Sequence, residues 1–155
     1  MTDQADESTK ADVEAVAYRL LARRDHARRE LADKLRRRHF DTALIEEVLD
    51  ECAASGYLDD RRFSLHQGGI LARKCWGPLQ IRQKLRLRGV AADIIDDTLE
   101  TLRDDFDWEH QARDRLHCRF DTADKLDTDD RARAYRHLTY RGYPSALVRR
   151  ILFDH

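Results

Sequence analysis

The chain has 155 residues, of which 29 are Lys or Arg and 30 are Asp or Glu, so its formal net charge is −1. Hydrophobic residues make up 41% and charged residues 38%, which allows modest cores beneath a largely ionic surface. This balance excludes a protein that binds polyanions through bulk charge, and no apolar run approaches the roughly 18 residues of a membrane span. The 3 cysteines form no CxxC motif, which is typical of a reducing compartment.

Residues 1–12 are polar and acidic, which predicts a disordered leader without a secretory signal, so we expect a cytoplasmic protein. Apolar residues at helical spacing begin at Val13 and predict a helix to about Arg24. Asp25 is placed to cap a second helix, whose core stripe starts at Leu31.

The second helix is expected to end at His39, where the backbone should enter the left-handed region that suits glycine best. Asp41 then caps a third helix, and Phe40 and Ile45 are placed to form a hydrophobic staple across its start. Three helices with a tight turn between the last two therefore occupy residues 13–55.

The same pattern occurs twice more. Three segments align without gaps at a spacing of about 50 residues: 28–49, 78–99 and 131–152. Equivalent positions hold a core leucine, an arginine and a turn residue: Leu35, Leu85 and Leu138; Arg38, Arg88 and Arg141; His39, Gly89 and Gly142. We therefore expect an all-α protein of three tandem three-helix, helix-turn-helix-like repeats, at 13–55, 56–103 and 104–155.

The middle repeat contains two glycines where a helix is expected. Gly68 and Gly69 should each destabilise that helix by roughly 1 kcal/mol relative to alanine. Either another backbone packs closely there or the helix is weak, and the sequence leaves both readings open. Pro78 is placed at the start of the following helix.

Charge is distributed unevenly along the chain. Between Arg61 and Ala92 there are 8 basic residues and no acid, whereas between Asp93 and Glu109 there are 8 acids and one base. Such asymmetry predicts opposite potentials on different surfaces, although two ordinary solvated faces would give the same pattern.

No motif for catalysis or cofactor binding is present. The sequence contains no GxxxxGK[ST], no GxGxxG and nothing that resembles a catalytic triad. Paired acids occur at expected helix starts, which favours capping and solvation over metal binding. His110, Asp114, His117 and Cys118 can meet along one helix, but no second cluster completes a metal site. We therefore expect no enzyme, no cofactor and no metal.

Helix-turn-helix geometry raises the alternative of a regulator that binds duplex DNA by itself. The helices that would read bases, at 41–51 and 92–102, are acidic, which opposes entry into a negatively charged groove. Sequence-specific binding is therefore disfavoured, while phosphate contact by the basic helices stays open. A scaffold with no role on DNA is a third reading.

Three stretches resemble the RecX family of regulatory proteins: LLARRDHARREL at 20–31, GYLDDRRF at 56–63 and GPLQIRQKLRLRGV at 77–90. The similarity extends over residues 15–152 in the family's repeat order. It implies an elongated, curved array that binds the RecA recombinase and its filament on DNA. Inhibition of strand exchange, ATP hydrolysis and coprotease activity, with effects on DNA repair and the SOS response, is implied as well.

The chain departs from the family pattern at His39, at Gly68-Gly69 and in a longer linker at 121–130. These departures put local stability in doubt more than the resemblance itself.

An array with a basic middle and acidic flanks suits a partner that presents both protein and phosphate. We expect weak, nonspecific binding to single- and double-stranded DNA, binding to the RecA filament, and a monomer that does not contact membranes. The predicted basic surface consists of Arg36, Arg37, Arg61, Arg62, Arg73, Lys74, Arg82, Lys84 and Arg86. For any single one of these residues, an ordinary solvated charge is the competing reading.

Overall fold

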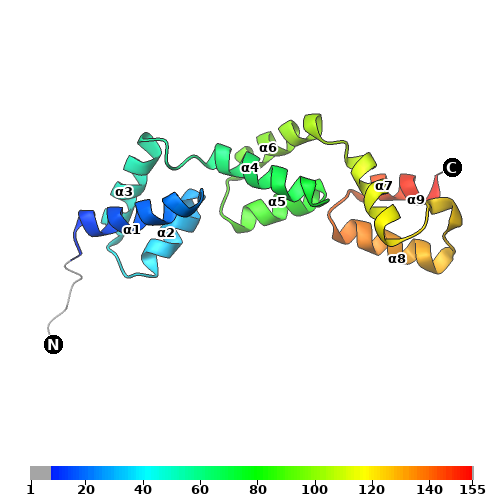
Figure 1. Ribbon diagram of the computed structural model, residues 1–155, viewed down its shortest axis with the longest axis horizontal. Helices are drawn as coiled ribbons and strands as arrows, with labels where there is room; N and C mark the ends of the chain where they lie inside the picture. The colour runs from blue at the N-terminus through cyan, green and yellow to red at the C-terminus, as the bar shows by residue number, and fades with distance from the viewer. Residues whose placement is uncertain (1–7, 155) are drawn as a thin grey trace.

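The computed structural model describes residues 8–154, which form three bundles of three helices arranged end to end in a shallow arch (Figure 1). The first bundle contains α1 (Lys10–Arg23), α2 (Arg28–Arg36) and α3 (Thr42–Ala54). The second contains α4 (Asp60–Arg73), α5 (Pro78–Leu87) and α6 (Ala92–Asp105). The third contains α7 (Trp108–Arg119), the short turn η1 (Ala123–Lys125), α8 (Thr128–Tyr140) and α9 (Ser145–Phe153).

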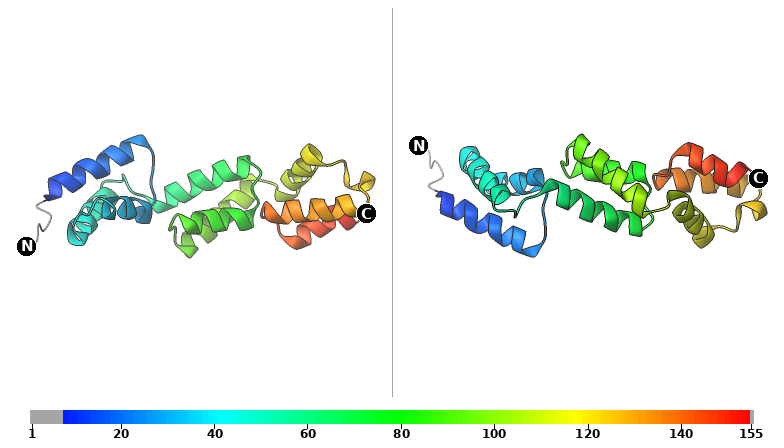
Figure 2. Two further views of the ribbon diagram at one scale, coloured as in Figure 1. Left: turned by 90° about the horizontal axis from the view of Figure 1, so that it is seen from below. Right: turned by 90° about the horizontal axis from the view of Figure 1, so that it is seen from above.

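Each bundle has its own hydrophobic core, as expected for repeats of this kind. Figure 2 shows the bundles following one another in both perpendicular views, so the predicted all-α, elongated and curved array is confirmed. No helix within residues 8–154 is long and apolar enough to cross a membrane.

The first helix begins earlier than predicted. Thr9 caps α1 by accepting a hydrogen bond from the Asp12 backbone, and the Asp12 carboxylate accepts one from the Thr9 N–H at 2.9 Å. This capping box extends the helix to Lys10, so the prediction of disorder up to residue 12 is wrong for its last residues. The rest of the predicted leader, residues 1–7, lies outside the described residues.

The predicted cap of α2 is also wrong. Asp25 makes no capping contact, and the residue at the cap position is Ala27, which has no side-chain acceptor. Asp60, at the start of α4, instead accepts a hydrogen bond from the Arg28 N–H at 2.8 Å. The second helix of the first bundle is therefore capped by the second bundle.

The repeated turn between the last two helices has the predicted left-handed backbone. The φ angles are 64° at His39, 85° at Gly89 and 95° at Gly142, so this prediction is confirmed at all three positions. Asp41 caps α3 as expected, accepting from the Ala43 N–H at 2.7 Å.

Close packing explains one of the two glycines in α4. A Cβ on Gly68 would lie 3.0 Å from a methyl of Leu102 and 3.1 Å from the methyl of Thr98, both on α6. Ser64, one turn earlier, shares a buried hydrogen bond with Thr98 at 2.6 Å. The neighbours of Gly68 are therefore side chains of α6 and not the backbone that one reading expected, and a Cβ on Gly69 would meet only the side chain of Arg73.

The bundles are joined by a contact that recurs along the array. In the second junction, the Gly77 N–H donates to the Arg141 carbonyl at 2.7 Å and the Leu79 N–H donates to the Gly142 carbonyl at 3.0 Å. The turn of the third bundle thus lies against the start of α5 in the second.

The first junction has the same arrangement, with the Gly89 turn packed on Arg29 near the start of α2. Arginines that are equivalent in the repeat reach back across both junctions. Arg88 lies 3.6 Å from Glu30 in the first, and Arg141 donates to the Cys75 carbonyl at 3.1 Å in the second. The array therefore has a direction, because each turn docks on the bundle that precedes it.

Candidate functional site

The nine residues of the predicted basic surface lie at the protein surface but do not form one patch. Arg61 and Arg62 lie at the start of α4, while Arg73 and Lys74 lie at its end. A 14-residue helix is about 20 Å long, so these two pairs are well separated. Three further members lie on α5: Arg82, Lys84 and Arg86. The last two, Arg36 and Arg37, lie at the end of α2 in the first bundle.

Several of these cations already have acidic partners. Arg61 contacts Asp97 at 2.6 Å and Arg82 contacts Asp96 at 2.7 Å, so carboxylates of α6 face the predicted basic surface. Arg36 likewise pairs with Asp33 at 2.8 Å, and Arg62 pairs with Asp25 at 3.3 Å. The acidic and basic runs are therefore interleaved in space. Of the predicted set, these residues have no acidic partner within the described part of the chain: Arg37, Arg73, Lys74, Lys84 and Arg86.

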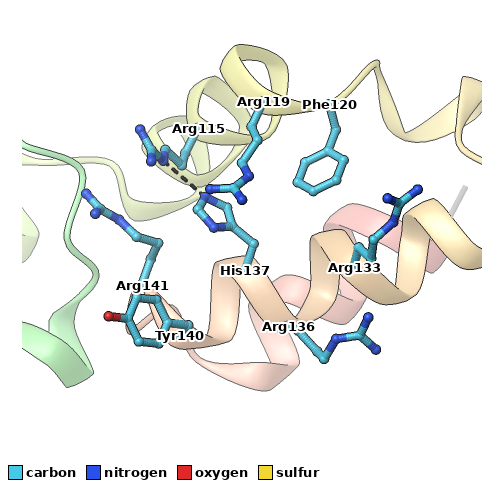
Figure 3. A pocket seen from close by; sticks show the side chains of 8 residues that line it. All are labelled: Arg115, Arg119, Phe120, Arg133, Arg136, His137, Tyr140 and Arg141. Carbon is cyan, nitrogen blue, oxygen red and sulfur yellow. Dashed lines mark hydrogen bonds between the residues drawn. The ribbon is translucent and has the colours of Figure 1, made fainter.

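The third bundle contains a cationic site that the sequence reasoning did not identify. A hollow of about 710 Å³ opens between α7 and α8 (Figure 3). We call it the arginine cleft, and its lining consists of Arg115, Arg119, Phe120, Arg133, Arg136, His137, Tyr140 and Arg141.

Helical spacing places these side chains on facing walls. Arg115 and Arg119 are four residues apart on α7, so both point toward α8, as Figure 3 shows. On α8, Arg133, Arg136 and Tyr140 are three or four residues apart and lie along the opposite wall. The sequence signal was this spacing of arginines with aromatic residues. It was obscured because the five acids of residues 121–130 separate the two groups of arginines along the chain.

His137 reports the electrostatic character of the cleft. Its Nε2 accepts a hydrogen bond from the Arg115 Nε at 3.1 Å, which requires a neutral imidazole. Burial, together with the nearby charges of Arg119, Arg115 and Arg141, lowers the pKa of His137 to about 4. The histidine is therefore uncharged at neutral pH and leaves the positive charge to the arginines.

Arg141 connects the cleft to the junction between the second and third bundles. Its guanidinium lies 3.7 Å from the centre of the Trp76 ring and donates to the carbonyls of Lys74 and Cys75. Lys84 lies over the same ring at 4.2 Å. Two cations and an indole thus continue the cationic surface from the cleft onto the second bundle.

No cluster of metal-binding side chains occurs among residues 8–154. His110 and Asp114 lie 3.3 Å apart on an exposed face of α7, where they form an ordinary pair one turn apart. Asp59 caps α4, and Asp96 and Asp97 take part in the ion pairs described above. The chemistry that the described surface supports is the binding of anions.

Comparison with known proteins connects this array to one family. Residues 15–52 match the model for the first three-helix domain of RecX, and residues 59–99 match the model for the second. The regulatory protein RecX of Halorhodospira halophila is 40% identical over 137 residues, covering 88% of this chain and 84% of the relative. That of Pseudomonas savastanoi is 35% identical over 144 residues, covering 93% and 92%.

Solved structures agree on the fold. A crystal structure of RecX from Lactobacillus salivarius superposes with a TM-score of 0.79 at 17% identity, covering 92% of this chain and 94% of that one. A second crystal structure, of a regulatory protein RecX, gives 0.75 at 21% identity and covers 94% and 74%. The three-bundle arrangement is therefore shared with proteins of quite different sequence.

Proposed function

Because this chain belongs to the RecX family of regulatory proteins, we propose that it binds the RecA recombinase and the filament that RecA forms on DNA. In this proposal it inhibits ATP hydrolysis, strand exchange and coprotease activity, and so modulates DNA repair and the SOS response. It acts in the cytoplasm, as a monomer and without catalysis. The observation that carries the proposal is identity of 40% to a regulatory protein RecX over 88% of the chain.

The shape of the molecule supports this role. An array of three bundles is longer than a compact domain of the same size, and its extended surface suits a partner that is itself a repeating filament. The predicted basic surface remains our proposal for the contact with RecA and DNA. Its accessible, unpaired members, such as Arg73 and Arg86, are the first candidates for that contact.

The alternative of a self-sufficient duplex-binding regulator is less well supported. The helices that would enter the major groove are α3 and α6, and their exposed faces carry carboxylates such as Glu46 and Glu47 on α3 and Asp93 and Glu100 on α6. These faces would repel the phosphates that line the groove. We therefore keep weak, nonspecific DNA binding as part of the main proposal.

The direct test is DNA-dependent ATP hydrolysis by RecA from the same source, with this protein titrated in. Inhibition at substoichiometric ratios is expected, since one molecule on a filament affects many subunits. An unchanged hydrolysis rate at molar excess would refute the proposal and favour independent DNA binding.

A charge reversal locates the contact. Arg86→Glu should weaken inhibition because Arg86 is exposed and has no acidic partner among residues 8–154. Arg82 is less suitable, because a glutamate there would face Asp96 and disturb the fold. Arg103→Glu on α6 is the matched control, as it makes the same change on an exposed, unpaired residue outside the predicted surface. Equal inhibition by wild type and Arg86→Glu would remove Arg86 from the contact.

A further inference from the structure

The arginine cleft carries positive charge that is poorly balanced. Within the described chain, Arg133 is the one arginine of the cleft that has a carboxylate partner, Asp130. Arg115, Arg119 and Arg136 face or flank the cavity without such a partner (Figure 3). Guanidinium groups gathered in this way repel one another, and an anion between them would relieve the repulsion.

Aromatic rings lie among these cations. Phe120 borders the cavity at the end of α7, and Tyr140 on α8 is 67% exposed. The Tyr140 ring lies 6.2 Å from that of Trp76, which extends the aromatic surface across the junction. Accessible rings next to unpaired arginines are what a single nucleic-acid strand uses, since its phosphates need cations and its unstacked bases need flat apolar surfaces.

The shape of the site favours a single strand over other anions. Arg115 and Arg119 project from α7 toward α8 (Figure 3), and Arg133 and Arg136 line the same hollow from α8. A duplex, by contrast, keeps the faces of its bases within the stack and offers only its outer phosphates. A small inorganic anion would use the guanidinium groups and leave the rings without a function.

We propose that the arginine cleft binds the phosphodiester backbone of single-stranded nucleic acid, with Tyr140 and Phe120 receiving unstacked bases. The inference rests on the proposed function for the source of the strand, because a RecA filament is built on DNA. It assigns the strand to the third bundle, which the predicted basic surface does not include.

The test is the binding of a short fluorescein-labelled oligothymidylate at low ionic strength, followed by fluorescence anisotropy without RecA. The double variant Arg119→Ala/Arg136→Ala removes two exposed side chains that form no ion pair among the described residues. We expect its affinity to fall by about tenfold or more, and the slope of log K against log salt to become shallower by about 1.4. Tyr140→Ala should lower the affinity by about fivefold or more without changing that slope.

The matched control is Arg19→Ala/Arg23→Ala, which removes two exposed arginines, one turn apart on α1, that form no ion pair among residues 8–154 and belong neither to the cleft nor to the predicted basic surface. Its affinity should stay within about twofold of wild type, because distant surface charges are screened. Circular dichroism and the melting temperature confirm that both double variants are folded. Equal losses in the two double variants would overturn the proposal in favour of bulk charge.

Three further outcomes separate the cleft from neighbouring explanations. Displacement of the oligothymidylate by inorganic phosphate at the same phosphate concentration would overturn the proposal and identify a small-anion site. Wild-type protein that inhibits RecA but binds no oligothymidylate would overturn the cleft and leave the proposed function standing. Strand binding without any inhibition of RecA would support the cleft and refute the proposed function.

Discussion

The junction between the second and third bundles depends on the absence of a side chain at Gly77. A Cβ there would lie 2.4 Å from the carbonyl carbon of Gly142 and 2.6 Å from the Tyr143 nitrogen. Backbone atoms of the two bundles would have to separate by about 1 Å to reach ordinary contact distance. Such a shift breaks the Gly77 N–H bond to Arg141 and the Leu79 N–H bond to Gly142.

We therefore expect Gly77→Ala to lower the free energy of unfolding by about 2 kcal/mol. Each lost hydrogen bond accounts for about 1 kcal/mol, and the smaller freedom of alanine in the unfolded chain offsets only part of the loss of packing. The backbone of Gly77 is extended, with φ −79° and ψ 168°, so alanine adds no conformational strain. The expected loss of stability therefore measures the contact between the two bundles, without a contribution from backbone strain.

Urea unfolding followed by tryptophan fluorescence measures this cost, because Trp76 lies at the junction beneath Arg141. The matched control is Gly56→Ala, where φ is +81° and no atom lies within 4 Å of the added Cβ. In that variant only the left-handed backbone at residue 56 is strained, which costs about 1 kcal/mol, and the junction between the bundles is unchanged. If Gly77→Ala lost no more stability than Gly56→Ala, the reasoning about the junction would be refuted.

Three other predictions follow from contacts described above. Gly69→Ala should stabilise the protein by about 1 kcal/mol in urea unfolding, because its Cβ would meet only the flexible end of Arg73. Gly68→Ala should destabilise the protein by about 1–2 kcal/mol, because its Cβ would crowd Leu102; stabilisation by both substitutions would show that helix propensity outweighs packing here. Asp60→Ala should cost about 1 kcal/mol by uncapping α2, while Asp60→Asn, which keeps an acceptor oxygen, should cost less. Stability should decline as the pH falls from about 6.5 toward 4: the pKa of His137 is about 4 in the folded protein and near 6.5 unfolded, so the unfolded chain takes up the proton first. His137→Gln should reduce the pH dependence of the urea midpoint, and an unchanged dependence would assign it to other groups.

Local and periodic features of the fold were predictable from the sequence. The ungapped repeat located the core leucines, and the shared turn position predicted the left-handed backbone at His39. Asp41 caps its own helix, so its role followed from position alone. These features depend on residues within one turn of each other.

Features that depend on contacts between distant segments were not predictable in this way. The cap of α2 comes from Asp60, which is 32 residues away and belongs to another bundle. Ion pairs such as Arg82–Asp96 could be predicted only if the packing of α5 on α6 were known. The arginine cleft is formed by side chains of α7 and α8 that an acidic segment, residues 121–130, separates along the chain, so it required the packing of α7 on α8 to be known.

The directional junction also sets a limit on growth of the array. Glycine at each junction turn allows approach so close that an added Cβ would lie 2.4 Å from Arg29 at Gly89, or from Gln80 at Gly142. The equivalent turn of the first bundle carries His39, whose Cβ occupies that space. A further bundle, from this chain or from a second copy, therefore cannot pack against this turn as bundles do at the Gly89 and Gly142 turns. His39 thus prevents the array from being extended at this turn by the same kind of junction.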